Sequence, residues 1–402
     1  KDTNRAATRL VQTRDGDREF NKDKNVRTAV MHATGDANGN VATGAQVAFG
    51  DSLNGWDLLD GAYRFNKDSE KAENDLTLTI DAQLCKTAYS ALNGRKGAVG
   101  VYNYKTGEIL CMVSSPSFDP ENPPDMEANP EQYEGVYMNR LLSAAYTPGS
   151  VFKLVTAAAA IDNLKDYKTK VYHCGGELEV NGNLVTCPAA HGDLTLEQAL
   201  WHSCNVTFAQ ITLEIGAGTL QKYAEKAGFN SSLEVNGIKT AAGRVDVLGA
   251  EPQELAWAGI GQYSDTANPL SFMAYMGAIA NDGVRISPVI LRNGGKSDAI
   301  PGLAGNGKRI LSDETADILG KMMRNAVINV YGEKNYGGLE LCAKSGTAEV
   351  GGGKTPHAWF AGFLDRDDCP FAFVVVVENG GSGAGVAGPV AAKVLKAAVN
   401  RS

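Results

Sequence analysis

The sequence predicts an α+β fold, in which strands from both ends of the main domain form an antiparallel sheet and a helical region lies between them. Two β-rich runs, at residues 97–104 and 108–115, are joined by a short Lys-Thr-Gly link and predict a hairpin. Helical apolar spacing dominates residues 150–280. Strand-like runs then return at residues 339–350, 358–364 and 371–378. A helix predicted at residues 389–399 closes the chain, so we expect the first and last helices to cover the sheet.

The first part of the chain has a different character. Residues 1–75 are rich in Asp, Asn, Lys and Gly and show little sustained apolar periodicity, which predicts a short irregular accessory segment. The pattern then changes, because residues 76–80 are strand-like, Asp81 is a typical N-cap and residues 82–92 have helical spacing. We therefore place the main domain at residues 76–402.

Composition narrows the class of protein. The chain has 402 residues, 43% of them hydrophobic, which is typical of a globular protein with a substantial core. Its formal charge is -8 and its basic residues are scattered, so we expect no nucleic-acid partner. The sequence contains neither a long apolar run nor a signal-peptide pattern, but it lacks an initiating Met. A trimmed N-terminal membrane anchor therefore has to be considered.

The chain contains seven cysteines, and one pair stands apart from the others. Cys174 and Cys187 flank an Asn-Gly turn signal, with His173 and His191 close by in the sequence. A hairpin would bring the two sulfurs together, which leaves open a disulfide, a small zinc site or two reduced thiols. Four other cysteines lie in apolar segments and are expected to be packed free thiols: Cys85, Cys111, Cys342 and Cys369.

The first chemical motif is S-x-x-K at Ser150 and Lys153. A Pro-Gly turn delivers Ser150 to the start of an Ala-rich helix, where its hydroxyl lies near the positive end of the helix dipole. Lys153 lies on the same face of this apolar helix. Burial favours a neutral amine, which can take the proton of Ser150 as the serine attacks a carbonyl. Taken alone, the pair is more often a helix N-terminus with a partly buried lysine stem.

The second motif is S-x-N at Ser203 and Asn205, between two segments with helical spacing. At such a junction the two side chains can project together into a cleft, Ser203 passing a proton and Asn205 holding an amide group. Taken alone, these residues more often cap a turn between helices.

The third motif, Lys344-Ser345-Gly346-Thr347, lies in a strand-like run. Gly346 permits close approach of an extended substrate, and Lys344 supplies positive charge. The hydroxyls of Ser345 and Thr347 suit a carboxylate, and a strand N–H suits an oxyanion. Taken alone, the run is more often an edge strand protected by a lysine.

All three motifs occur in one chain, in the order S-x-x-K, S-x-N, K-[T/S]-G, each on the expected element. With them the chain resembles the class B, or monofunctional, penicillin-binding proteins over most of the sequence after about residue 76. Two departures are mild: Ser345 stands where threonine is commoner, and a cysteine occupies the centre of S-x-N. Further matching stretches lie at residues 78–81, 106–110, 112–119 (MVSSPSFD), 139–141, 259–262, 280–283 and 357–360.

The resemblance implies a β-lactamase/transpeptidase-like fold with a helical subdomain, and it assigns roles to the motif residues. Its implied catalytic residues are Ser150 as nucleophile, Lys153 as its activator, and Ser203, Asn205 and Lys344. Its implied substrate-binding residues are Ser345, Gly346 and Thr347. The backbone N–H groups of Ser150 and Thr347 would form the oxyanion hole. No metal and no cofactor is implied for this chemistry.

The implied activity is that of a peptidoglycan D,D-transpeptidase, which forms an acyl-enzyme with D-Ala-D-Ala stem peptides, cross-links the cell wall and is inhibited by β-lactams. The implied location is the extracellular face of the bacterial cytoplasmic membrane, with a membrane glycosyltransferase as partner. The alternatives within the same fold are a D,D-carboxypeptidase, a β-lactamase and a β-lactam sensor. A non-catalytic scaffold would be expected to lose Ser150, Lys153 or Lys344, and all three are present.

Overall fold

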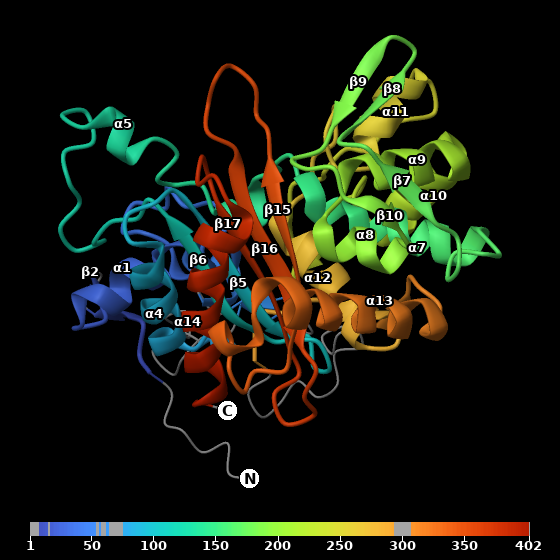
Figure 1. Cartoon of the computed structure of the whole chain (residues 1–402). Coiled ribbons are helices and arrows are strands. Elements are labelled where there is room, and N and C mark those ends of the chain that lie inside the picture. The colour runs from blue at the N-terminus through green and yellow to red at the C-terminus, as the bar shows by residue number, and fades with distance from the viewer. Residues whose placement is uncertain are drawn as a thin grey trace.

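A five-stranded antiparallel sheet forms the centre of the molecule (Figure 1). The computed structural model describes residues 8–14, 17–53, 56–57, 62–63, 75–292 and 307–401. The strand order is β15-β16-β17-β5-β6, so the predicted hairpin and the three C-terminal strands join in one sheet through the pairing of β17 with β5. The α+β prediction is therefore confirmed. The strands are β5 (Gly97–Asn103), β6 (Ile109–Ser115), β15 (Leu341–Ala348), β16 (His357–Leu364) and β17 (Phe371–Val377).

Helices cover both faces of this sheet. As predicted, the helices α4 (Ala82–Leu92) and α14 (Gly388–Val399) pack against each other on one face. Asp81 caps α4, because its side chain accepts hydrogen bonds from the first backbone N–H groups of the helix. On the other face, α12 (Pro269–Ala280) contacts β5, β16 and β17 and is buried along almost its whole length. This double cover explains why every residue of β17 is apolar and buried.

The helical region lies beside the sheet and includes the short turn η1 (Gly149–Phe152) (Figure 1). A capping box between Thr195 and Gln198 begins α8, as the sequence predicts. The hairpin of β8 and β9 turns at the predicted Asn-Gly pair. The elements of this region are α7 (Lys153–Asn163), β7 (Tyr172–Cys174), β8 (Glu177–Val180), β9 (Asn183–Thr186), β10 (Gly192–Leu194), α8 (Leu196–His202), α9 (Asn205–Ile215), α10 (Ala217–Ala227), α11 (Pro252–Ala258) and α13 (Asp313–Ala326).

The predicted strand at residues 76–80 does not form. A single antiparallel bridge joins Leu78 to Leu291 there, made by the backbone N–H of Thr79, which donates to Ile290 O, and that of Arg292, which donates to Thr77 O. The remaining short elements are β1 (Val11–Arg14), β2 (Asp17–Phe20), α2 (Ala45–Ala48), α3 (Gly50–Leu53), β3 (Trp56–Asp57), β4 (Ala62–Tyr63), α5 (Pro130–Tyr133), α6 (Arg140–Ser143), β11 (Glu234–Val235), β12 (Ile238–Lys239), β13 (Val284–Ile286), β14 (Gly307–Arg309), the π-helical turns η2 (Val327–Tyr331) and η4 (Gly383–Ala387), and η3 (Glu333–Asn335).

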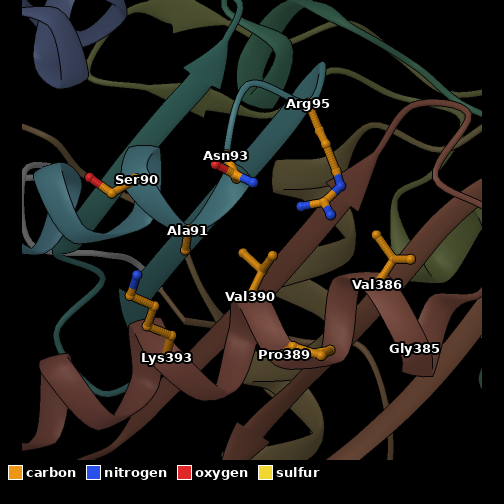
Figure 2. Close-up of a pocket in the computed structure, with 9 residues that line it drawn as sticks. All are labelled: Ser90, Ala91, Asn93, Arg95, Gly385, Val386, Pro389, Val390 and Lys393. Atoms are coloured by element: carbon orange, nitrogen blue, oxygen red, sulfur yellow. The ribbon is translucent and has the colours of Figure 1, made fainter.

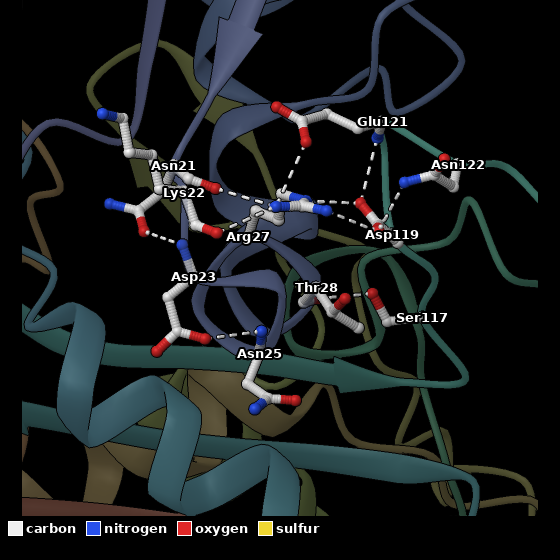
Figure 3. Close-up of polar contacts among 10 residues, drawn as sticks. All are labelled: Asn21, Lys22, Asp23, Asn25, Arg27, Thr28, Ser117, Asp119, Glu121 and Asn122. Atoms are coloured by element: carbon white, nitrogen blue, oxygen red, sulfur yellow. Dashed lines mark hydrogen bonds and ion pairs between the residues drawn. The ribbon is translucent and has the colours of Figure 1, made fainter.

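A helix that the sequence analysis did not predict, α1 (Lys24–Thr34), packs against α4 and β6. A buried ion pair fixes it, because Nε of Arg27 lies 2.5 Å from one carboxylate oxygen of Asp119 and Nη2 lies 2.7 Å from the other (Figure 3). The Arg27 guanidinium lowers the pKa of Asp119 to about 2. Part of the segment before residue 75 lies outside the described residues, and the domain boundary placed there stays a prediction.

Within the described ranges, no helix has both the length and the apolar character needed to cross a membrane.

Candidate active site

Ser150 lies in η1, the tight turn that leads into α7, and its side chain is half-buried. The turn is held by backbone contacts, since the N–H of Gly149 donates to Gly261 O at 2.9 Å. It also presses against β15, because a Cβ on Gly346 would lie only 2.9 Å from Pro148 O. The sequence analysis assigned the space above Gly346 to a substrate. In the structure, the turn that carries the serine uses this space.

Lys153, the first residue of α7, joins the first two motifs. Its side chain is fully buried, and Nζ lies 3.1 Å from Ser150 Oγ, 2.5 Å from Ser203 O and 2.8 Å from Asn205 Oδ1. Burial lowers the pKa of Lys153 from 10.5 to about 7. A neutral amine has two hydrogens, which suit the two carbonyl oxygens. Its lone pair is then left for the O–H of Ser150.

Lys344 brings the third motif to the same point. Its side chain is also fully buried, and Nζ lies 2.9 Å from Ser203 Oγ, which is itself 3.3 Å from Lys153 Nζ. Burial, reinforced by the positive charge of Lys153, lowers the pKa of Lys344 well below its usual value. In the part of the chain that the structure describes, no carboxylate hydrogen-bonds Ser150, Lys153, Ser203 or Lys344. The site therefore favours a neutral amine close to the serine.

The helix junction predicted for S-x-N is present, with Ser203 ending α8 and Asn205 beginning α9. Ser203 has φ 54°, a left-handed conformation that is uncommon for a residue other than glycine. Both ends of the Asn205 amide are engaged by the protein, because Oδ1 accepts from Lys153 and Nδ2 donates to Thr186 O at 2.9 Å. Asn205 therefore positions Lys153 in this structure, whereas the sequence analysis expected its side chain to hold an amide group.

β15 is an edge strand, so one side of it is open. Side chains alternate along a strand, which places Ser345 and Thr347 on the face opposite Lys344. The hydroxyl of Ser345 lies 3.0 Å from the hydroxyl of Tyr331, a half-buried residue that carries no motif and that the sequence analysis missed. The side chain of Thr347 is exposed, and its Oγ1 accepts from Gly383 N at 3.4 Å. The more accessible hydroxyl beside the open edge is thus that of Thr347.

A separate pocket of about 390 Å³ lies between the end of α4 and the start of α14 (Figure 2). It is lined by residues such as Asn93, Arg95 and Lys393, and by none of the predicted site residues. The motif residues instead meet between α7, the junction of α8 with α9, and β15.

Comparisons with known proteins show which family this chain resembles. The model of the penicillin-binding protein transpeptidase domain matches residues 97–396. The chain is 28% identical over 331 residues to the peptidoglycan D,D-transpeptidase PbpA of Mycobacterium tuberculosis, which covers 76% of this chain and 67% of the relative. It is 27% identical over 366 residues to the peptidoglycan D,D-transpeptidase MrdA of Acinetobacter baumannii, a match that covers 79% of this chain and 53% of the relative.

Solved structures match nearly the whole chain. Penicillin-binding protein A from M. tuberculosis, as a ceftriaxone acyl-enzyme complex, gives a TM-score of 0.81 at 25% identity, covering 96% of this chain and 95% of that one. The D,D-transpeptidase domain of a peptidoglycan glycosyltransferase from Eggerthella lenta gives a TM-score of 0.79 at 27% identity, covering 97% and 95%. Since the family model spans more than half of the chain and the three motifs converge on one serine, this chain belongs to the penicillin-binding protein transpeptidase family.

Proposed function

We propose that this chain is a peptidoglycan D,D-transpeptidase that forms an acyl-enzyme on Ser150 with D-Ala-D-Ala stem peptides and cross-links the cell wall. One observation carries the proposal. The buried amine of Lys153 contacts Ser150, Ser203 and Asn205 at once, and its pKa is lowered toward neutrality. The relatives named D,D-transpeptidase and the acyl-enzyme complexes of similar structures support the same reaction.

Acylation begins when Lys153 takes the hydroxyl proton of Ser150. The serine oxygen then bonds to the carbonyl carbon of the penultimate D-Ala, and negative charge develops on the carbonyl oxygen. We assign the oxyanion hole to the backbone N–H groups of Ser150 and Thr347. The closeness of the two segments supports this assignment, because a Cβ on Gly149, the residue before Ser150, would lie 2.7 Å from Thr347 O.

The intermediate collapses when the C–N bond to the terminal D-Ala breaks and the leaving nitrogen takes a proton. Ser203 is suited to relay that proton, since its hydroxyl lies between the amines of Lys153 and Lys344. The amine of a second stem peptide then attacks the ester, transfers a proton back and frees Ser150. In a β-lactam the leaving nitrogen stays tethered to the acyl group, so the acyl-enzyme persists and the drug inhibits the enzyme.

The third motif is proposed to bind the end of the substrate. An extended stem peptide can add to the open edge of β15, which leaves its terminal carboxylate near the exposed hydroxyl of Thr347. Ser345 contributes a second hydroxyl, held by Tyr331. Gly346 keeps this strand close to the turn of Ser150.

The alternatives differ in the fate of the acyl-enzyme. A β-lactamase or a carboxypeptidase must hydrolyse the ester, which needs a base to activate water. Among the described residues, no carboxylate hydrogen-bonds Ser150 or Lys153, and this favours slow hydrolysis. A non-catalytic scaffold would have no reason to keep three motifs in contact.

Intact-protein mass spectrometry after incubation with benzylpenicillin tests the proposal. We expect one adduct that persists for many minutes and maps to Ser150, and none in Ser150→Ala. An adduct that survives in Ser150→Ala would exclude the assigned nucleophile. Rapid loss of the adduct with release of opened penicillin would instead identify a β-lactamase.

We also propose that the chain acts at the extracellular face of the bacterial cytoplasmic membrane, where stem peptides are located, beside a membrane glycosyltransferase that supplies glycan strands. The likeness to the transpeptidase domain of a peptidoglycan glycosyltransferase supports this pairing of activities. Fractionation of cells that produce the full-length protein, followed by labelling with a fluorescent penicillin, tests the location.

A further inference from the structure

Three cysteines and a histidine cluster directly behind the S-x-N turn. Cys174 ends β7, Cys187 follows β9, His191 precedes β10, and Cys204 is the N-cap of α9. One ligand atom from each residue lies within 4.8 Å of all the others. The three thiols are free, and Cys174 and Cys204 are buried. His173, considered from the sequence as a partner, is instead exposed and paired with Asp193.

The spacing within this cluster fits a tetrahedral metal. Sγ of Cys187 lies 3.8 Å from Sγ of Cys204 and 3.4 Å from Nδ1 of His191, and Sγ of Cys174 lies 3.6 Å from the same nitrogen. A tetrahedral Zn²⁺ with bonds of about 2.3 Å to sulfur and about 2.0 Å to nitrogen separates its ligands by roughly 3.5–3.8 Å. A disulfide needs about 2.05 Å between sulfurs.

The surroundings also favour thiolates. The backbone N–H of Asn205 donates to Sγ of Cys187 at 3.4 Å, and that of Thr207 donates to Sγ of Cys204 at the same distance. Such donors, together with the positive end of the α9 dipole at Cys204, stabilise negative sulfur. The cluster therefore has the donors of a metal site and an outer layer of hydrogen bonds.

We propose that Cys174, Cys187, His191 and Cys204 bind one structural zinc ion. Three thiolates and one imidazole in a closed tetrahedron are a typical structural zinc set, and they leave no position open for substrate. Binding releases the thiol protons to solvent and ties together the ends of two antiparallel strand pairs and the start of α9.

The site also positions the active-site turn, an inference that rests on the proposed function. Cys204 lies between Ser203 and Asn205, which both contact Lys153. Zinc bound to Cys204 would hold this turn, and through it the amine of Lys153, in place.

Metal analysis of the purified, reduced chain tests the site without reference to activity. We expect one zinc per chain, and thiolate-to-cobalt charge-transfer bands with tetrahedral d–d absorption after exchange with Co²⁺. Cys174→Ser and His191→Ala should lose the metal. Two matched controls should keep it: Cys85→Ser changes a buried thiol elsewhere, and His202→Ala removes a ring 5.3 Å from that of His191.

Absence of zinc from protein prepared with the metal, together with no cobalt charge transfer, would overturn the proposal. So would a disulfide between Cys187 and Cys204 found by peptide mapping, or full zinc content in Cys174→Ser. If the variants do not fold, the cobalt spectrum of the unaltered chain still tests whether the metal site exists.

The positioning role has its own test. Chelation should slow acylation by penicillin at least tenfold, and added zinc should restore the rate. An unchanged rate in zinc-free protein would reject positioning while leaving the metal site intact. A chain that carries zinc but is never acylated would refute only the proposed function.

Discussion

Protonation of Lys153 should govern the rate of acylation. Its pKa falls from 10.5 to about 7 on burial. At about 1.36 kcal/mol for each pH unit, burial disfavours the ammonium form by about 5 kcal/mol relative to an exposed lysine. The amine is then about one tenth neutral at pH 6, half neutral at pH 7 and about nine tenths neutral at pH 8. Since the base must be neutral, the second-order rate of acylation should rise about tenfold from pH 6 to pH 8 and then level off.

The rate can be measured with a fluorescent penicillin at constant ionic strength. Lys344 and Lys153 both contact the Ser203 hydroxyl. The pH at which the acylation rate is half-maximal therefore reports the titration of the two amines together. Lys153→Ala provides the control, and its rate should be lower by several orders of magnitude and show no rise over this range. A rate for the unaltered chain that is constant from pH 6 to pH 8, or one that rises only near pH 10, would refute the reasoning.

Three further substitutions separate binding from stability. Thr347→Val removes the exposed hydroxyl but keeps the backbone N–H, so acylation by carboxylate-bearing penicillins should slow about tenfold to a hundredfold, and an esterified analogue much less; equal slowing of both would reject the carboxylate assignment. Tyr331→Phe removes the two hydrogen bonds that its hydroxyl makes with Ser345, one with Oγ and one from the backbone N–H, and should lower the free energy of unfolding in urea by about 2 kcal/mol; no change would show that these bonds are not stabilising. Asp119→Asn breaks the buried pair with Arg27 and should cost about 3–5 kcal/mol. Because the folded pKa of Asp119 lies below its usual 3.8, the unaltered chain should lose about 2.5 kcal/mol of stability as pH falls from about 5 to 1, and Asp119→Asn should not show that loss.

The sequence predicts the elements of this fold better than their contacts. Turn residues and apolar runs are local signals, which is why the sheet strands and α8 lie where they were expected. The contacts of Lys153 with Ser203, and of Ser203 with Lys344, join positions far apart in the chain. No local pattern encodes such distances, so the family resemblance had to supply them.

Some features were missed although a signal existed. Val26, Ala29, Val30 and Ala33 have the i, i+3, i+4, i+7 spacing of α1, but polar residues and turn signals around them obscured the pattern. Cys204 was not linked to the other thiols because it lies inside the S-x-N motif. Tyr331, by contrast, gave no sequence signal, since it contacts Ser345 from a π-helical turn that no local pattern predicts.

The tight packing around Ser150, the proposed nucleophile, has a consequence for drug resistance. A Cβ on Gly261 would lie 2.1 Å from Gly149 O, and one on Gly346 would lie 2.9 Å from Pro148 O, so backbone surrounds the turn of Ser150 on two sides. Any side chain at either glycine would displace Ser150, so changes at these two positions should impair reaction with substrate as much as reaction with β-lactams.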